Sequence, residues 1–183
     1  MKIAGLLKYI FMVFGFWVIG LSPAWAQIEA SPTFSYDTRH TISEIMSTMA
    51  DPAAWVLWNP TEEFDDDGSF VIPDDDDFWN NLRNKAVILG EVANLINMPG
   101  RVSNNRREET AAEVVLSAEE FEALIKEQRP AWEAYSAALT NIAAQYYQAA
   151  QARDASAYDW EGGLGAQMNT VCASCHLQFW YPK

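Results

Sequence analysis

Two long stretches of the chain place their hydrophobic residues at alternating spacings of three and four positions. They are Trp79, Leu82, Ala86, Leu89, Ala93 and Ile96 in the first stretch, and Trp132, Tyr135, Leu139, Ile142, Tyr146 and Ala149 in the second. Such spacing puts one apolar stripe along each of two helices. No stretch of comparable length alternates with the period of two that is typical of strands. The pattern predicts an all-α protein, folded as an antiparallel four-helix bundle.

The two long helices have clear predicted boundaries. Acidic residues 74–77 precede the first of these two long helices, where carboxylates favour the positive end of the helix dipole. Pro99 and Gly100 end this helix. Ser117 and Glu120 form a capping box, which predicts that a helical turn begins before the second long helix. Pro130 is then expected to kink or divide that helix.

An earlier segment supplies the first predicted helix of the bundle. Its apolar face consists of Ile42, Ile45, Met46 and Met49. We expect Asp51 and Pro52 to act as an N-cap and first-turn proline that restart the helix through Trp58, with a bend near Ala50.

The last predicted helical segment covers roughly residues 155–179. One face of it carries Leu164, Met168, Val171, Cys175 and Phe179. Gly162, Gly163 and Gly165 lower its intrinsic helix stability. These glycines either break the helix or let a bulky group approach its backbone.

The first 26 residues have the pattern of a secretory signal peptide. Lys2 and Lys8 give a basic start, residues 9–20 are apolar, and residues 24–26, Ala-Trp-Ala, offer small residues at the cleavage site. An uncleaved anchor is the alternative, but the apolar stretch is shorter than the roughly 20 residues that span a bilayer. We therefore expect a mature domain of residues 27–183 in an oxidising compartment, most simply a bacterial periplasm.

The chain is strongly acidic, and this property limits its partners. Its formal net charge is −13, and loss of the two leader lysines takes the charge to about −15. Such a surface repels phosphate backbones and anionic lipids, so nucleic-acid binding and membrane attachment after cleavage are not expected. The charge leaves basic proteins or small neutral ligands as the expected partners.

Much of the acidity is concentrated in residues 62–77. Within this loop, five residues fall on offsets 1, 3, 5, 6 and 12 of a calcium-binding EF-hand loop: Glu63, Asp65, Asp67, Gly68 and Asp74. The first ligand position lacks Asp and the twelfth lacks Glu, and no helix leads properly into the loop. A solvated acidic loop is the favoured interpretation, with calcium or partner binding left open.

The motif that carries chemistry is Cys172-Ala173-Ser174-Cys175-His176, the pattern of c-type haem attachment. Two thiols one helical turn apart can add to the two vinyl groups of a haem, while the adjacent imidazole reaches the iron from one side. The sequence therefore predicts one covalently bound haem c held by Cys172 and Cys175.

Two other interpretations of the motif each lack a component. A thioredoxin-like dithiol follows a strand, whereas this motif lies near the end of a predicted helix. A structural zinc site needs four ligands, and outside the motif the chain has only His40 and no further cysteine. An ordinary disulfide between Cys172 and Cys175 remains the simplest alternative.

A haem motif near the C-terminus, on the last of four helices and after a signal peptide, resembles the cytochrome c prime family of bacterial class II c-type cytochromes. The resemblance spans most of the mature chain, although only the CxxCH motif is specific. It implies thioether links at Cys172 and Cys175 and a proximal iron ligand at His176. Because many relatives pair as dimers through their first two helices, a homodimer is one state that the resemblance implies.

The sixth iron position decides what such a haem does. Six-coordinate members of the family take a methionine from the first helix, and Met46 matches that place best. Met49 and His40 are the alternatives, and the position is vacant in members that bind small gases. Met168 shares a helix with His176 and Met98 lies at a helix end, so neither is expected to reach the iron.

These observations predict a periplasmic monohaem cytochrome that carries single electrons and is not an enzyme. The carboxylates gather in the acidic loop, and no nucleophile-base pair remains once the motif residues are assigned. A five-coordinate haem protein that binds NO or CO is the first alternative. A haem-free CxxC thiol oxidoreductase is the second.

Overall fold

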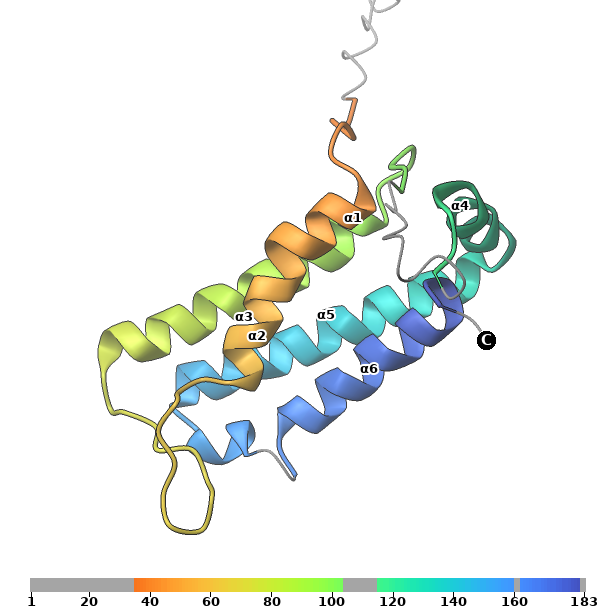
Figure 1. Cartoon of the computed structure of the whole chain (residues 1–183). Coiled ribbons are helices and arrows are strands. Elements are labelled where there is room, and N and C mark those ends of the chain that lie inside the picture. The colour runs from red at the N-terminus through yellow and green to blue at the C-terminus, as the bar shows by residue number, and fades with distance from the viewer. Residues whose placement is uncertain (1–34, 104–114, 160–161, 182–183) are drawn as a thin grey trace, which may run out of the picture. The chain divides into compact units, whose positions relative to one another are not determined.

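A computed structural model describes residues 35–103, 115–159 and 162–181, which form an all-α structure (Figure 1). The elements are α1 (Ile42–Ile45), the π-helix η1 (Met46–Ala50), α2 (Asp51–Trp58), α3 (Asp76–Ile96), α4 (Ala118–Glu127), α5 (Arg129–Ala152), the 3-10 helix η2 (Ala155–Tyr158) and α6 (Leu164–Phe179). The described residues contain no β-strand, only an isolated bridge between Phe64 and Phe70. The predicted all-α class is confirmed. The predicted signal peptide lies outside the described residues.

Helices α3 and α5 pack along each other in opposite directions and form the centre of the core. Arg153, just after α5, pairs with Asp74, just before α3, through a 2.6 Å contact. At the other end, Arg129 donates to the carbonyl oxygen of Asn97 at 3.1 Å. All the predicted apolar positions on these helices are buried, except the half-buried Tyr135. Their three-four spacing therefore identified the core correctly.

The predicted helix starts before α4 and α5 are confirmed. The Ser117 side chain accepts from the Glu120 amide, and the Glu120 carboxylate accepts from the Ser117 amide, which completes the capping box. Pro130 lies in the first turn of α5 and divides it from α4. Proline is tolerated there because the first amides of a helix have no intrahelical acceptor.

The first helical segment is continuous where the sequence predicted a restart. Thr41 and Glu44 form a capping box at its start. The backbone then passes through η1 into α2, and the Asp51 amide donates to the Met46 carbonyl five residues earlier. Asp51 is itself helical and makes no side-chain cap, so its predicted role as an N-cap was wrong. The wide π turn carries the helix past Pro52, which cannot donate a backbone hydrogen bond.

The last helix begins later than predicted. Residues 155–158 form η2, and α6 begins only at Leu164. A Cβ atom at Gly163 would lie 2.4 Å from the carbonyl oxygen of Asp159, so the chain makes a tight turn that only glycine fits. The segment 155–179 is therefore not one helix, and a break at its glycines, one of the two outcomes predicted for them, is confirmed.

The acidic loop is exposed and is tied to the helices at its end. The rings of Phe64 and Phe70 lie 4.9 Å apart at its base, and Arg153 pairs with both Asp74 and Asp76. In the part of the chain that the structure describes, no group of three His, Cys, Asp or Glu side chains could hold a metal ion. The calcium alternative gains no support. No helix within the described ranges is long and apolar enough to span a membrane.

Candidate haem-binding site

Helix α6 carries all three motif side chains on one face. Cys172, Cys175 and His176 occupy positions i, i+3 and i+4, which are neighbours on a helix surface. Each is half-buried, and both cysteines pack against the hydrophobic core as free thiols. The helix thus presents two thiols and an imidazole together on a partly covered surface.

Burial sets the protonation states of these groups. It raises the pKa of the Cys172 thiol to about 11, and burial together with the charge of Cys172 raises the pKa of Cys175 to about 12. Burial also lowers the pKa of His176. The thiols are therefore protonated and the imidazole is neutral at pH 7. A neutral imidazole can donate its lone pair to a metal, whereas a reactive dithiol needs a lowered pKa.

Two aromatic rings contact the imidazole of His176 at the end of α6. The Trp180 ring meets it edge to face, with 4.9 Å between centroids and an interplanar angle of 88°, and Tyr181 lies at 6.0 Å. The amides of both residues donate to the His176 carbonyl oxygen at 2.8 and 2.9 Å. The Leu116 amide, before α4, donates to the Trp180 carbonyl oxygen at 2.9 Å. Trp180 lies one helical turn after His176, so its place beside the imidazole follows from the spacing, whereas only folding brings Leu116 to this end of α6.

The side of α6 that faces α5 is anchored by aromatic packing. Phe179 is buried, and its ring centroid lies 5.2 Å from that of Trp132 and 6.1 Å from that of Tyr135. The Tyr135 hydroxyl donates to Gln178 at 2.9 Å. Met168, on the same helix, is fully buried. These contacts fix the rotation of α6 and hence the direction of its motif face.

A buried hydroxyl group lies beside the start of α6. Tyr146 of α5 is fully buried, and its hydroxyl has no hydrogen-bond partner within the described ranges. A Cβ atom at Gly165 would lie 3.8 Å from this oxygen. Burial raises the pKa of Tyr146, and the charges of Tyr158 and Cys172 raise it further. An unpartnered polar group is therefore held in the core on the side of α6 that carries Cys172.

The candidate sixth ligands all lie in the first helical segment or just before it. Met46 and Met49 are in η1 and are half-buried against the core. The His40 side chain is 80% exposed, and its Nδ1 lies 3.9 Å from a Glu44 carboxylate oxygen. Met98, which was not expected to reach the iron, lies after α3 and accepts a hydrogen bond from Arg101. Of these side chains, the two methionines of η1 are therefore the ones that face apolar surroundings.

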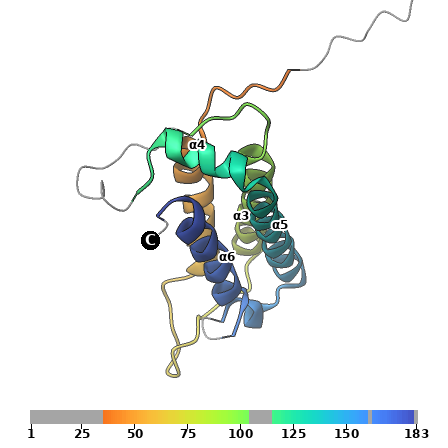
Figure 2. The same ribbon diagram turned by 90° about the vertical axis from the view of Figure 1, so that its right-hand side faces the viewer.

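The segment with Met46 and the helix with His176 meet at one end and separate at the other. The Trp58 indole, at the end of α2, donates to the Gly165 carbonyl oxygen at 3.1 Å. From there, α1 and η1 pack against α3, while α6 packs against α5 and α4. In Figure 1 their ribbons diverge away from the Trp58 end. Figure 2 shows α4 lying across the other end.

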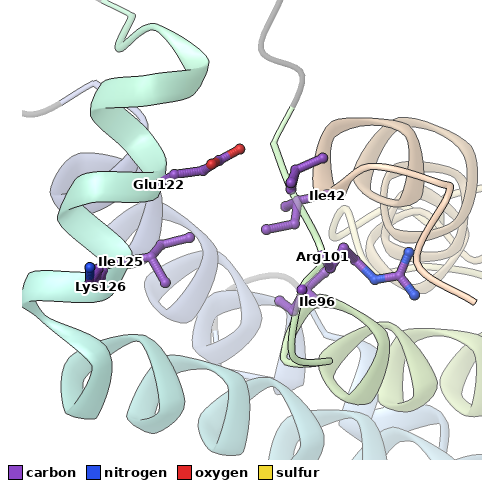
Figure 3. A pocket seen from close by; sticks show the side chains of 8 residues that line it. Ile42, Ile96, Arg101, Glu122, Ile125 and Lys126 are labelled. Atoms are coloured by element: carbon purple, nitrogen blue, oxygen red, sulfur yellow. The ribbon is translucent and has the colours of Figure 1, made fainter. Parts of the chain in front are cut away.

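A small open cavity lies at that other end, between α1, α3 and α4 (Figure 3). It has a volume of about 240 Å³. Its apolar wall consists of Ile42, Ile96, Val102 and Ile125. Glu122 lies at its edge, where its carboxylate accepts from the Ser103 amide at 2.9 Å. None of the motif residues of α6 lines this cavity, so it is separate from the CxxCH face.

Comparisons with known proteins returned nothing similar: no family model, curated protein or solved structure matches this chain. The chemistry of the site therefore rests on its own residues.

Proposed function

We propose that this chain is a monohaem c-type cytochrome that carries single electrons. The observation that supports this most is the presentation of Cys172, Cys175 and His176 on one partly covered face of α6, with a neutral imidazole. Cys172 and Cys175 would hold haem c through thioether bonds, and His176 would be the proximal iron ligand. The N-terminal leader supports export to the periplasm, where such attachment takes place.

The described residues fit a haem in two respects. The motif side chains lie against the hydrophobic core, so a large apolar ring system attached to them would be partly shielded from water. The buried hydroxyl of Tyr146 lies in the same region and has no hydrogen-bond acceptor among the described residues. Because a buried hydroxyl without a partner is costly, a ligand that supplies an acceptor there is a physical reason for keeping it.

We assign the haem to the region between the first helical segment and α6. In this proposal, residues 42–58, α3, α5 and α6 form the antiparallel four-helix bundle that the sequence analysis expected. The arrangement is that of the cytochrome c prime family. Met46, on the segment opposite α6, is the proposed distal ligand.

The bound haem supplies an iron centre that gains and loses one electron. The residues of this chain provide its setting. The core beside Cys172 and Cys175 would shield the attached ring system from water on one side, which would reduce the solvent reorganisation that accompanies a change of charge. The rings of Trp180 and Tyr181 restrict the imidazole of His176. The acidic surface favours redox partners with basic docking surfaces.

One observation favours a second candidate function, the binding of small gases. The η1 segment packs against α3, and the pairs of closely packed elements do not include η1 with α6. A half-buried Met46 that stays on this segment would leave the sixth iron position vacant. The protein would then bind NO or CO on a five-coordinate haem.

Absorption spectra of the purified mature protein test both proposals. An electron carrier with a methionine ligand is low-spin when oxidised, and it binds carbon monoxide slowly or not at all when reduced. A gas-binding protein is high-spin and takes up carbon monoxide at once. Protein without any haem bands, produced in a host that matures c-type cytochromes, would contradict both.

Variants of the motif separate attachment from loose binding. Cys172→Ala together with Cys175→Ala should release the haem on acid-acetone extraction. Ser174→Ala, between the two cysteines, is the matched control and should retain it. Equal retention in both variants would contradict the thioether assignment.

A further inference from the structure

The end of α6 exposes two large apolar side chains in a region without charge. Residues 162–181 contain no Asp, Glu, Lys or Arg, although the whole chain has a formal net charge of −13. Leu177 is 50% exposed and Trp180 is 40% exposed. Depletion of charge and an exposed aromatic side chain are typical of the centre of a protein-protein interface. We call Leu177 and Trp180 together the terminal patch.

The terminal patch lies next to His176. The indole of Trp180 meets the imidazole of His176 edge to face, with 4.9 Å between the ring centroids. His176 is half-buried, whereas Trp180 reaches the solvent. The two rings therefore form a continuous path from the imidazole to the surface. Because electron tunnelling slows steeply with distance and across gaps, rings in contact are a favourable path.

Acidic side chains border the terminal patch on the side of α4. The Leu116 amide donates to the Trp180 carbonyl oxygen at 2.9 Å, so the start of α4 is held at the end of α6 (Figure 2). Glu119 and Glu120 follow in the first turn of α4, and both are exposed. The Glu120 carboxylate accepts from the Ser117 amide at 2.8 Å, one residue after Leu116. Two carboxylates thus lie within four residues of the contact with Trp180.

The helix itself adds negative potential at this end. The macrodipole of a helix places partial negative charge at its C-terminus. Residues 162–181 contain no Lys or Arg that would offset this charge. The terminal patch is therefore an apolar centre in negative surroundings. Its electrostatic complement is a partner surface with an apolar centre and a rim of Lys or Arg side chains.

We propose that the terminal patch is the docking surface for a one-electron redox protein with such a basic rim, and that electrons pass between the two proteins through Trp180. The inference rests on the proposed function, because it takes His176 as an iron ligand. In each exchange one protein loses one electron and the other gains it. No proton moves, and no covalent bond forms or breaks.

Two other arrangements fit the structure less well. The acidic loop of residues 62–77 carries more negative charge, but it follows α2, whose Trp58 contacts Gly165 at the start of α6. That end of the helix is remote from His176 (Figure 1). A second copy of this chain at the terminal patch would bring two acidic borders together, which repel each other. Both arrangements are outcomes of the tests below.

The first test measures electron exchange with a basic c-type cytochrome that has lysines around an exposed haem edge, used as the probe. Stopped-flow absorbance at low ionic strength gives the second-order rate constant. Leu177→Lys should lower it at least about tenfold, because the new charge repels the lysines of the probe. Trp55→Lys is the matched control on α2, where the side chain is 66% exposed, and should change the rate less than about twofold. Equal losses in the two variants would overturn the proposal.

A second pair of variants makes the same change of charge at two acidic sites. Glu119→Lys alters the border of the terminal patch, and Asp66→Lys alters the exposed acidic loop. We expect Glu119→Lys to slow the exchange by roughly three- to tenfold and Asp66→Lys by less than about twofold. The reverse order would assign docking to the acidic loop and overturn the proposal.

Variants of Trp180 separate docking from a local effect on His176. Trp180→Ala should slow the exchange by roughly thirtyfold, as loss of a central tryptophan does at interfaces, and Trp180→Phe should recover most of the rate. Rates are compared at equal driving force, from the reduction potential of each variant. Reduction by dithionite, a small reagent that needs no docking, should be equally fast in all variants. If Trp180→Ala slows dithionite in the same proportion, docking through Trp180 is refuted.

Cross-linking locates the docking surface without measuring a rate. A carbodiimide joins carboxylates of this chain to lysines of the bound probe, and mass spectrometry identifies the linked peptides. The most abundant linked peptide should contain Glu119 or Glu120. A most abundant peptide from residues 62–77 would overturn the proposal.

Sedimentation and haem content complete the test. A dimer of wild type that is lost in Leu177→Lys would assign the terminal patch to a second copy and overturn the proposal. A chain without covalent haem would contradict the proposed function and this inference together. A haem-bearing chain that gives equal rates for the patch and control variants would contradict this inference alone.

Discussion

The Trp58 indole N–H donates to the Gly165 carbonyl oxygen at 3.1 Å, which joins the end of α2 to the start of α6. The two residues are 107 positions apart in the sequence. Their contact holds the first helical segment and the motif helix together at one end.

Trp58→Phe removes the donor and keeps an aromatic ring. The Gly165 carbonyl oxygen loses its side-chain partner, so we expect the free energy of unfolding to fall by about 1 kcal/mol. Urea denaturation measures the change. Trp55→Phe, on the exposed side of the same helix, is the control and should have little effect. Equal stability of Trp58→Phe and wild type would show that the contact contributes nothing.

Two glycines at the start of α6, Gly163 before the helix and Gly165 within its first turn, should respond oppositely to alanine. At Gly163 a Cβ would lie 2.4 Å from the backbone oxygen of Asp159, whereas at Gly165 its nearest neighbours stand at 3.5 and 3.8 Å. Gly163→Ala should destabilise the fold by more than about 2 kcal/mol, because backbone must move. Gly165→Ala should be neutral or stabilising by up to about 1 kcal/mol, because alanine favours the helix. Thermal unfolding of the two variants, compared with wild type, measures both.

The long helices and their caps could be predicted from the sequence because local pattern determines them. The Leu82 and Leu89 positions of α3 and the Ser117 capping box needed no knowledge of the rest of the chain. The continuous passage from η1 into α2 could not be predicted. Asp51 followed by Pro52 is a sequence that usually indicates the start of a new helix. A break before α6 was one of two outcomes predicted from its glycines, but its position depends on Asp159, which meets Gly163 only after the chain turns.

The CxxCH motif could be recognised from its residues alone, but the surroundings of the site could not. Trp180 follows His176 by one helical turn and is a local neighbour, whereas Leu116 reaches the backbone of Trp180 only in the folded chain. Tyr146 was predicted correctly as a core residue. Whether its hydroxyl has a hydrogen-bond partner depends on every neighbour that Tyr146 has in the folded chain. The spacing of hydrophobic residues along the sequence cannot predict those neighbours.

Removal of the Tyr146 hydroxyl should stabilise the haem-free chain. The group is buried without a partner, so Tyr146→Phe should raise the free energy of unfolding of haem-free protein by about 1 kcal/mol. Tyr158→Phe is the matched control. Its hydroxyl donates to the Tyr146 carbonyl oxygen at 3.4 Å, so its loss should lower stability instead. A destabilised haem-free Tyr146→Phe would mean that the hydroxyl has a partner after all.

The buried thiols should make the haem-free fold sensitive to alkali. Folding raises the pKa of Cys172 to about 11 and that of Cys175 to about 12, and unfolded thiols ionise near pH 9. The unfolded state therefore releases these protons first, and the stability present below about pH 9 is lost as the pH rises to 12. Cys172→Ser with Cys175→Ser should flatten this part of the stability profile. An unchanged slope in the double variant would assign the alkaline loss to other groups.

Met46→Ala should open the sixth position if Met46 is the distal ligand. The variant should become high-spin and take up carbon monoxide quickly. Met49→Ala, its neighbour in η1, should keep the wild-type spectrum and cost about 1 to 2 kcal/mol for lost apolar contact. If Met46→Ala stays low-spin, then His40 or Met49 is the ligand. If wild type is already high-spin, then the gas-binding alternative replaces the electron carrier.

Intact mass under denaturing conditions tests the central claim, covalent haem attachment, most directly. Thioether formation adds the thiols across the vinyl groups and loses no atoms. The mature protein should therefore weigh as much as residues 27–183 plus one whole haem. A mass equal to the polypeptide alone, or smaller by the two hydrogens of a disulfide between Cys172 and Cys175, would contradict the assignment.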